Sequence, residues 1–62
     1  MLCIKKFRLS KGLTQQDLAV LLGVRQNSVS LWERGFREPP IDKLIALSKI
    51  FNCSLDELVK EE

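Results

Sequence analysis

The chain has 62 residues, of which ten are basic and eight acidic, so its formal net charge is +2. A chain of this length forms one small domain, here spanning 1–62, that buries only about 60% of the surface its unfolded form exposes. That leaves little room for a deep catalytic cleft. Apolar residues make up 45% of the chain, which is too many for a disordered segment. Because the net charge is small, the placement of the charges must carry any argument for a nucleic-acid partner.

The residue types that serve catalysis and metal binding are scarce. There is no histidine, which removes the usual general base near neutral pH and the commonest zinc ligand. Cys3 and Cys53 stand near opposite ends of the chain and cannot supply the four ligands of a zinc site. We therefore expect no enzymatic activity, no metal and no cofactor. We expect two free thiols, although a bond between them is conceivable if the terminal helices pack together.

Two features of the sequence bear on where the protein resides. No apolar run approaches the roughly 20 residues that a membrane-spanning helix needs. The sequence also has no secretory leader pattern, and its cysteines suit a reducing compartment. We therefore expect a cytoplasmic protein with no membrane partner and no small-molecule ligand.

The first half of the chain is predicted to form two helices. Residues 2–10 have the apolar spacing of a helix, and Gly12 ends it. Thr14 begins the second helix, with Asp17 at the reciprocal position of a capping box. Gly23 ends this helix in a left-handed conformation, which glycine adopts at least cost. The residues predicted to face inward from the second helix are Leu18, Ala19 and Leu22.

Three further helices are predicted in the second half. One covers residues 26–34 and is followed by Gly35, and a stiff "REPP" connector comes next. The fourth covers about 41–51, and Pro40, directly before it, is suited to be the first helical residue. Its predicted buried residues are Leu44, Leu47, Ser48 and Phe51. "SLDE" is a full capping box that begins a short fifth helix with Leu55 and Leu58 inward.

The resulting fold class is all-α, a compact bundle of five short helices. Within it, the segment 14–35 is a helix, a turn of three to four residues, and a second helix. Gly23 lies at the bend, and the small side chain of Ala19 lets the second helix cross closely. Val29 and Trp32 anchor that second helix. This is a helix-turn-helix arrangement.

The other face of the second helix carries a polar row. Its members share the outward side of a 3.6-residue helix: Gln26, Asn27, Ser30, Leu31 and Arg34. An amide side chain offers one donor and one acceptor, which match N6 and N7 of adenine in the major groove. A serine suits several base edges or a phosphate, and Leu31 suits a thymine methyl. The alternative interpretation is a plain solvated surface.

Charged and amide residues around this row are candidates for phosphate contacts. Arg25 occupies the predicted N-cap position, where it accepts no hydrogen bond and its charge opposes the helix dipole. A phosphate there would bind both the arginine and the free N–H groups; alternatively, the cap is shifted or simply poor. Gln15 begins the preceding helix, where its amide is placed to bond to a phosphate and also to brace Gln26. The remaining phosphate candidates are Arg34, Arg37 and Lys43.

From Gln15 to Leu58 the sequence resembles the phage repressor and Cro-type (XRE) helix-turn-helix family. The resemblance rests on "LTQQDLAVLLGV", "VSLWERG", the position of Pro39 and "CSLDELV". It implies a lambda repressor-like bundle whose recognition helix, 26–34, enters the major groove. It places Gln26, Asn27 and Ser30 at base-contacting positions and Gln15 at a phosphate-contacting one. Leu31 departs from the polar or basic residue often found at its position.

The resemblance has two further implications. Arg8 and Glu33 match a pair that forms a structural salt bridge between the first and third helices. Family members usually bind pseudo-palindromic operators on double-stranded DNA as homodimers, with half-sites about 34 Å apart. Apolar residues left over for such an interface, Ile50 and Val59 above all, are Leu2, Leu9, Phe36, Ile45, Ile50 and Val59.

The sequence therefore favours a small DNA-binding transcriptional regulator, most simply a repressor. The alternative is a binding module of another class, either an antitoxin or a protein-interaction adaptor with the same fold. Binding to duplex DNA that weakens steeply with salt distinguishes the two.

Overall fold

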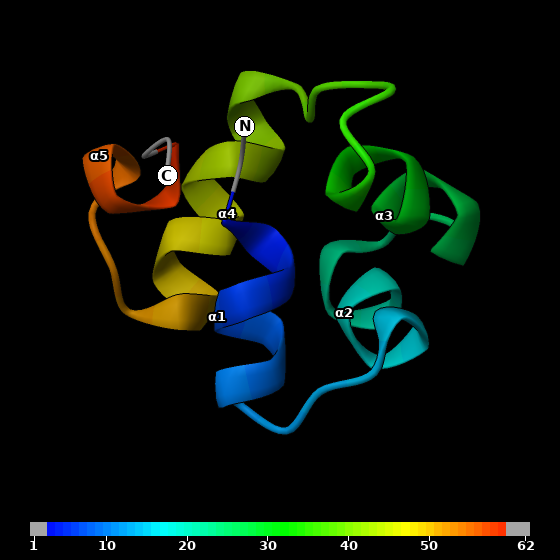
Figure 1. Ribbon diagram of the computed structural model, residues 1–62, viewed down its shortest axis with the longest axis horizontal. Coiled ribbons are helices and arrows are strands. Elements are labelled where there is room, and N and C mark those ends of the chain that lie inside the picture. Colours follow the sequence, from blue (N-terminus) through cyan, green and yellow to red (C-terminus); the bar gives the residue numbers. More distant parts are fainter. Residues whose placement is uncertain (1–2, 60–62) are drawn as a thin grey trace.

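A computed structural model describes residues 3–59, and these form five helices and no strand (Figure 1). Their bounds are α1 Ile4–Ser10, α2 Gln15–Leu22, α3 Gln26–Glu33, α4 Ile41–Phe51 and α5 Leu55–Leu58. The predicted all-α class is confirmed, and the bounds agree with the predicted ones to within a residue or two. Leu2, predicted to begin the first helix, lies outside the described residues.

The predicted helix-end signals act through the expected hydrogen bonds. The Thr14 hydroxyl accepts from the N–H of Asp17 at 3.0 Å, and the Asp17 carboxylate accepts from the N–H of Thr14 at 2.9 Å. Ser54 and Glu57 exchange the same two bonds at the start of α5, at 3.1 and 3.0 Å. Each box satisfies N–H groups that a helix end would otherwise leave unpaired.

Pro40 differs from its predicted position by one residue. It is the N-cap of α4, with φ −60° and ψ 159°, and the helix begins at Ile41. Its ψ is extended, so it precedes the helical turn. At the other end of α4, Asn52 takes the left-handed conformation with φ 52°, which no other non-glycine residue adopts within 3–59. Asparagine tolerates that region better than most residues.

The core lies where α1, α4 and α5 meet the α2–α3 pair. Its buried apolar residues are Ile4, Leu18, Ala19, Leu22, Val29, Trp32, Leu47, Phe51 and Leu58. The rings of Phe7 and Phe51 stack with centroids 5.6 Å apart, which joins α1 to the end of α4. The N–H of Cys3 donates to the carbonyl of Leu58 at 2.8 Å, so α5 is also tied to the start of α1.

Three side chains predicted to face inward are less buried than expected. Leu44 and Ser48 are half-buried. Leu55 is exposed, because α5 has a single turn and Leu58 alone on it reaches the core. Among the spare apolar residues, Ile50 packs against the core, whereas Leu9, Phe36, Ile45 and Val59 are exposed.

Two leucines on one helix provide a matched test of this core. Leu18 is 0% exposed and Leu21 is 58% exposed. We expect Leu18→Ala to lower the free energy of unfolding by about 2–5 kcal/mol, since it leaves a cavity. Leu21→Ala should cost less than about 1 kcal/mol. Urea denaturation followed by circular dichroism measures both, and equal losses would contradict the assignment.

The α2 capping box predicts a pH dependence. The N–H of Thr14 and then its hydroxyl lower the pKa of Asp17 below its ordinary value of 3.8. The bonded carboxylate therefore adds stability that is present above pH 3.8 and lost as the pH falls through the folded-state pKa. We expect the wild type to exceed Asp17→Asn in stability at neutral pH and to lose that advantage in acid. A difference in unfolding free energy that is constant with pH would refute this.

Candidate nucleic-acid interface

The bend between α2 and α3 is built by a glycine and a small buried side chain. Gly23 has φ 69° and ψ 32°, the left-handed conformation predicted for it. The N–H of Val24 then donates to the carbonyl of Ala19 at 3.0 Å, which turns the chain sharply at the end of α2. Ala19 is buried in the core, as its predicted inward position requires. The two helices form one side of the molecule in Figure 1.

The helix α3 has one buried and one exposed face, as its sequence predicts. Val29 and Trp32 are buried in the core. The opposite face is graded: Gln26, Asn27 and Arg34 are exposed, and Ser30 and Leu31 are half-buried. The predicted polar row thus lies together on the outer surface of the helix, where its amide groups are accessible to a partner.

The start of α3 lacks the usual cap. Arg25 is the N-cap residue, with φ −79° and ψ 148°, and its side chain makes no capping hydrogen bond. The first turn carries no acidic residue. An exposed guanidinium therefore lies beside the positive end of the helix dipole, an arrangement that suits an anion.

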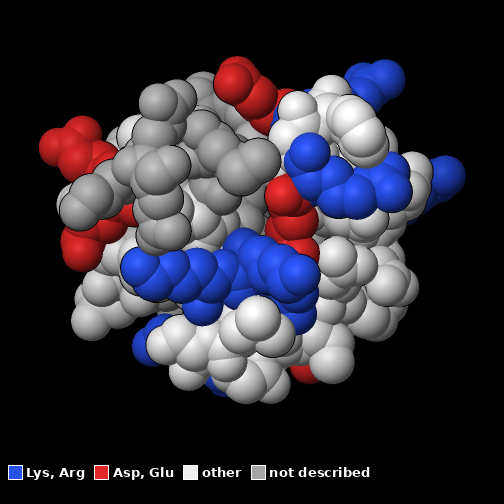
Figure 2. All heavy atoms as spheres, in the orientation of Figure 1, with Lys and Arg blue, Asp and Glu red and all other residues white. Residues whose placement is uncertain are grey.

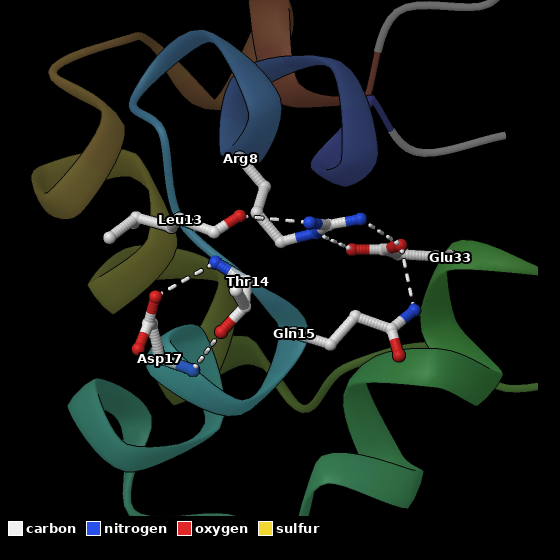
Figure 3. Close-up of polar contacts among 6 residues, drawn as sticks. All are labelled: Arg8, Leu13, Thr14, Gln15, Asp17 and Glu33. Carbon is white, nitrogen blue, oxygen red and sulfur yellow. Dashed lines mark hydrogen bonds and ion pairs between the residues drawn. The ribbon is translucent and has the colours of Figure 1, made fainter.

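A buried ionic cluster connects three helices beneath this surface (Figure 3). Glu33 Oε2 accepts from Arg8 Nε at 2.6 Å, and Oε1 accepts from Arg8 Nη2 at 3.1 Å. The two side chains are 9% and 3% exposed, so the expected ion pair forms in a low-dielectric setting. Arg8 Nη1 also donates to the carbonyl of Leu13 at 2.9 Å, directly before the α2 cap.

Gln15 completes that cluster. Its Nε2 donates to Glu33 Oε1 at 3.1 Å, and in Figure 3 its amide oxygen points away from Glu33. The sequence predicts a phosphate and Gln26 as partners of this amide and does not indicate Glu33, because nothing local links residues 15 and 33. A phosphate at Gln15 would use the second Nε2 proton.

Lys43 also has a protein partner that the sequence did not reveal. Its Nζ donates to the carbonyl of Leu22 at 3.0 Å and lies 4.0 Å from Asp42 Oδ2. This bond satisfies a carbonyl at the C-terminus of α2 and ties α4 to the bend. An ammonium has three protons, so the bond to Leu22 leaves others available to a further acceptor.

The other basic candidates lie at the end of α3. Arg34 and Arg37 are both exposed, and the guanidinium carbon of Arg34 lies 4.9 Å from the ring centroid of Phe36. Figure 2 shows basic side chains gathered over this end of α3 and over α1. Acidic side chains lie over α5, where Asp56 and Glu57 are exposed, and also between the two basic groups. Charges of both signs therefore occur on this face.

The described residues bear on three further expectations, which concern the cysteines, a metal site and a membrane span. Cys3 and Cys53 are half-buried and are not joined by a disulfide bond. Burial, followed by the nearby Glu57 carboxylate, raises the pKa of the Cys53 thiol. Within residues 3–59, no three His, Cys, Asp or Glu side chains gather closely enough to hold a metal ion. None of the helices described is long and apolar enough to cross a bilayer.

Comparison with known proteins agrees with this geometry. A family model described as helix-turn-helix matches residues 4–58. The chain belongs to the phage repressor and Cro-type (XRE) helix-turn-helix family. A curated relative, the uncharacterized HTH-type transcriptional regulator YqaE of Bacillus subtilis strain 168, is 44% identical over 59 residues. The match covers 95% of this chain and 51% of YqaE, so the chain spans about half the length of that relative.

Two solved structures are similar over nearly the whole chain. The P22 c2 repressor in complex with synthetic operator 9T has a TM-score of 0.86 and 37% identity, covering 95% of this chain and 89% of that one. SinR of Bacillus subtilis, the master regulator for biofilm formation, in complex with DNA, has a TM-score of 0.81 and 31% identity. That match covers 92% of each chain.

The ionic cluster yields a stability prediction. We expect Arg8→Met to cost about 3–5 kcal/mol of unfolding free energy, because the Glu33 carboxylate stays buried with one amide donor. The double variant Arg8→Met with Glu33→Leu should lose less than Arg8→Met alone, since no buried charge remains. Arg37→Met, at an exposed arginine, is the control and should change stability by about 0.5 kcal/mol or less. Chemical denaturation measures all three, and a double variant less stable than Arg8→Met would contradict the account.

Proposed function

We propose that this protein is a sequence-specific double-stranded DNA-binding transcriptional regulator, acting as a repressor. The observation that carries the proposal is the exposed amide row on α3, held outward by the buried Val29 and Trp32. Two proteins of the same fold have been solved on DNA. A repressor needs no chemistry, because occupying an operator is sufficient to exclude other proteins from it.

In this proposal α3 lies in the major groove and its outer face reads base edges. The base-contacting residues are Gln26, Asn27, Ser30 and Leu31. The first two are the most exposed and carry paired donors and acceptors that match adenine. Ser30 and Leu31 are half-buried, so their side chains would extend less far into the groove and contact bases closer to the helix axis.

Phosphate contacts would flank the groove on both sides. Their proposed residues are Gln15, Arg25, Arg34, Arg37 and Lys43. Arg25 and the α3 N-terminus would hold one phosphate, and Arg34 with Arg37 would hold the strand at the other end of the helix. Such contacts set the position of the protein on the duplex without reading sequence.

We further propose that the protein binds a pseudo-palindromic operator as a homodimer. Val59 on the surface and Ile45 on α4 supply exposed apolar area, whereas Ile50 packs inward and contributes less. A two-fold dimer would place two α3 helices one turn of DNA apart, about 34 Å. Sedimentation of the chain with and without its operator measures the stoichiometry.

The first test is selection from random duplexes. We expect recovery of one sequence with two related half-sites, bound with an affinity that falls steeply as salt rises. If no duplex sequence is enriched and salt does not change the binding, the antitoxin or adaptor alternative is favoured. A reporter gene fused to the selected operator then gives the direction of regulation. Increased transcription would show that the protein is an activator and not a repressor.

The second test removes one amide from the reading face. We expect Gln26→Ala to weaken binding to the selected duplex by about 1–3 kcal/mol and to relax the preference at one base pair. Gln16→Ala, at an exposed glutamine of α2, is the control and should bind as the wild type does. A loss that is uniform over all sequences would assign Gln26 to the backbone instead.

The third test concerns the unusual cap. Arg25→Ala should reduce the slope of log affinity against log salt by about 0.9, because one phosphate contact is lost. Lys49→Ala removes an equal charge from the last turn of α4, far from α3 in Figure 1, and should leave the slope unchanged. Equal slopes for wild type and Arg25→Ala would remove Arg25 from the interface.

A further inference from the structure

The helix α3 ends in a defined hydrogen-bonded turn. The N–H of Phe36 donates to the carbonyl of Leu31 at 3.0 Å, and that of Gly35 to the carbonyl of Trp32 at 3.2 Å. This is the pattern of a Schellman motif, and Gly35 has the positive φ, 78°, that the motif requires. The position of Phe36 relative to the end of α3 is therefore set by the backbone.

The side chain of Phe36 is large and apolar, yet it faces solvent. It is 70% exposed, and it is absent from the core and from the apolar residues that pack against the core. The contact that the structure records for its ring is the guanidinium of Arg34, 4.9 Å from the centroid. The ring therefore adds nothing to the packing of the core, and its recorded contact is with the Arg34 guanidinium.

That arginine occupies a position where its orientation matters. Arg34 is the C-cap residue of α3 and belongs to the outward row with Gln26 and Asn27. A free arginine side chain has many rotamers, which it must give up when it binds a phosphate. Stacking on a ring whose backbone position is set by the turn reduces the number of rotamers before DNA arrives. Cation–π attraction at an exposed site is strong enough to bias them.

We propose that Phe36 is a positioning residue for DNA binding, which holds the Arg34 guanidinium in place to bind a backbone phosphate at the C-terminal end of α3. The inference rests on the proposed function and adds to it a residue that touches neither base nor phosphate in this role. The ring acts through Arg34, so its effect disappears when Arg34 is absent. This dependence separates the proposal from a direct contact of Phe36 with DNA or with a second subunit.

A double-mutant cycle on the selected duplex tests the proposal. We expect Phe36→Leu, which keeps an apolar side chain but removes the ring face, to weaken binding about two- to fivefold. In an Arg34→Ala background the same change should alter binding less than about 1.5-fold, because no guanidinium remains to position. Phe36→Tyr retains the ring and should bind as the wild type does. Since the ring is exposed, the thermal midpoints of Phe36→Leu and the wild type should agree.

Each result supports or overturns the proposal. A Phe36→Leu variant that binds as the wild type does overturns it. So does a weakening of equal size in both backgrounds, which would indicate a direct DNA contact, or a dimer contact if sedimentation shows a changed stoichiometry. If the wild-type chain itself shows no sequence preference and no salt dependence, the proposed function fails and this inference falls with it. Selective binding by the wild type with no coupling between Phe36 and Arg34 overturns the inference alone.

Discussion

The carboxylate of Glu33 is the point where three helices are joined. It is nearly buried, and it accepts hydrogen bonds from Arg8 of α1 and Gln15 of α2 while belonging to α3. A buried charge is tolerated only when donors surround it, so the three helices must keep the positions that supply those donors. Arg8 also reaches the carbonyl of Leu13, which ties the same cluster to the turn before α2. The orientation of α3 relative to the rest of the molecule depends on this arrangement.

Because α3 is held from below, its outer face is free to carry residues that add nothing to stability. Val29 and Trp32 anchor the helix in the core, while Gln26 and Asn27 extend into solvent. The N-cap residue of α3 likewise adds nothing to stability. Arg25 is a poor cap and stands at the unfavourable end of the dipole, whereas the caps of α2 and α5 are complete. The starts of α1 and α4 also lack a side-chain cap, so what distinguishes α3 is an arginine at the N-cap itself, as expected where function opposes stability.

The contacts around α3 also show how the scaffold and the proposed interface share residues. Gln15 and Lys43 are phosphate candidates, yet each already donates to a protein acceptor, Glu33 and the Leu22 carbonyl respectively. These bonds fix the side chains in place, which favours a contact made by their remaining protons. Arg34 is oriented by the Phe36 ring in a comparable way. Preorganised groups of this kind lose less conformational entropy on binding than free ones.

The sequence by itself determined the five helices, their ends and the two faces of α3. Those features arise from local causes: capping boxes at Thr14 and Ser54, the left-handed Gly23, and apolar residues at helical spacing. The ion pair of Arg8 with Glu33 was expected through the family resemblance, not through any local pattern. Only the tertiary structure decided that Gln15 binds Glu33, that Lys43 caps α2 and that Leu55 stays outside the core. The physical reason is that a polar side chain takes whichever partner the folded chain brings within about 3 Å, and residues far apart in sequence meet only after the helices have packed.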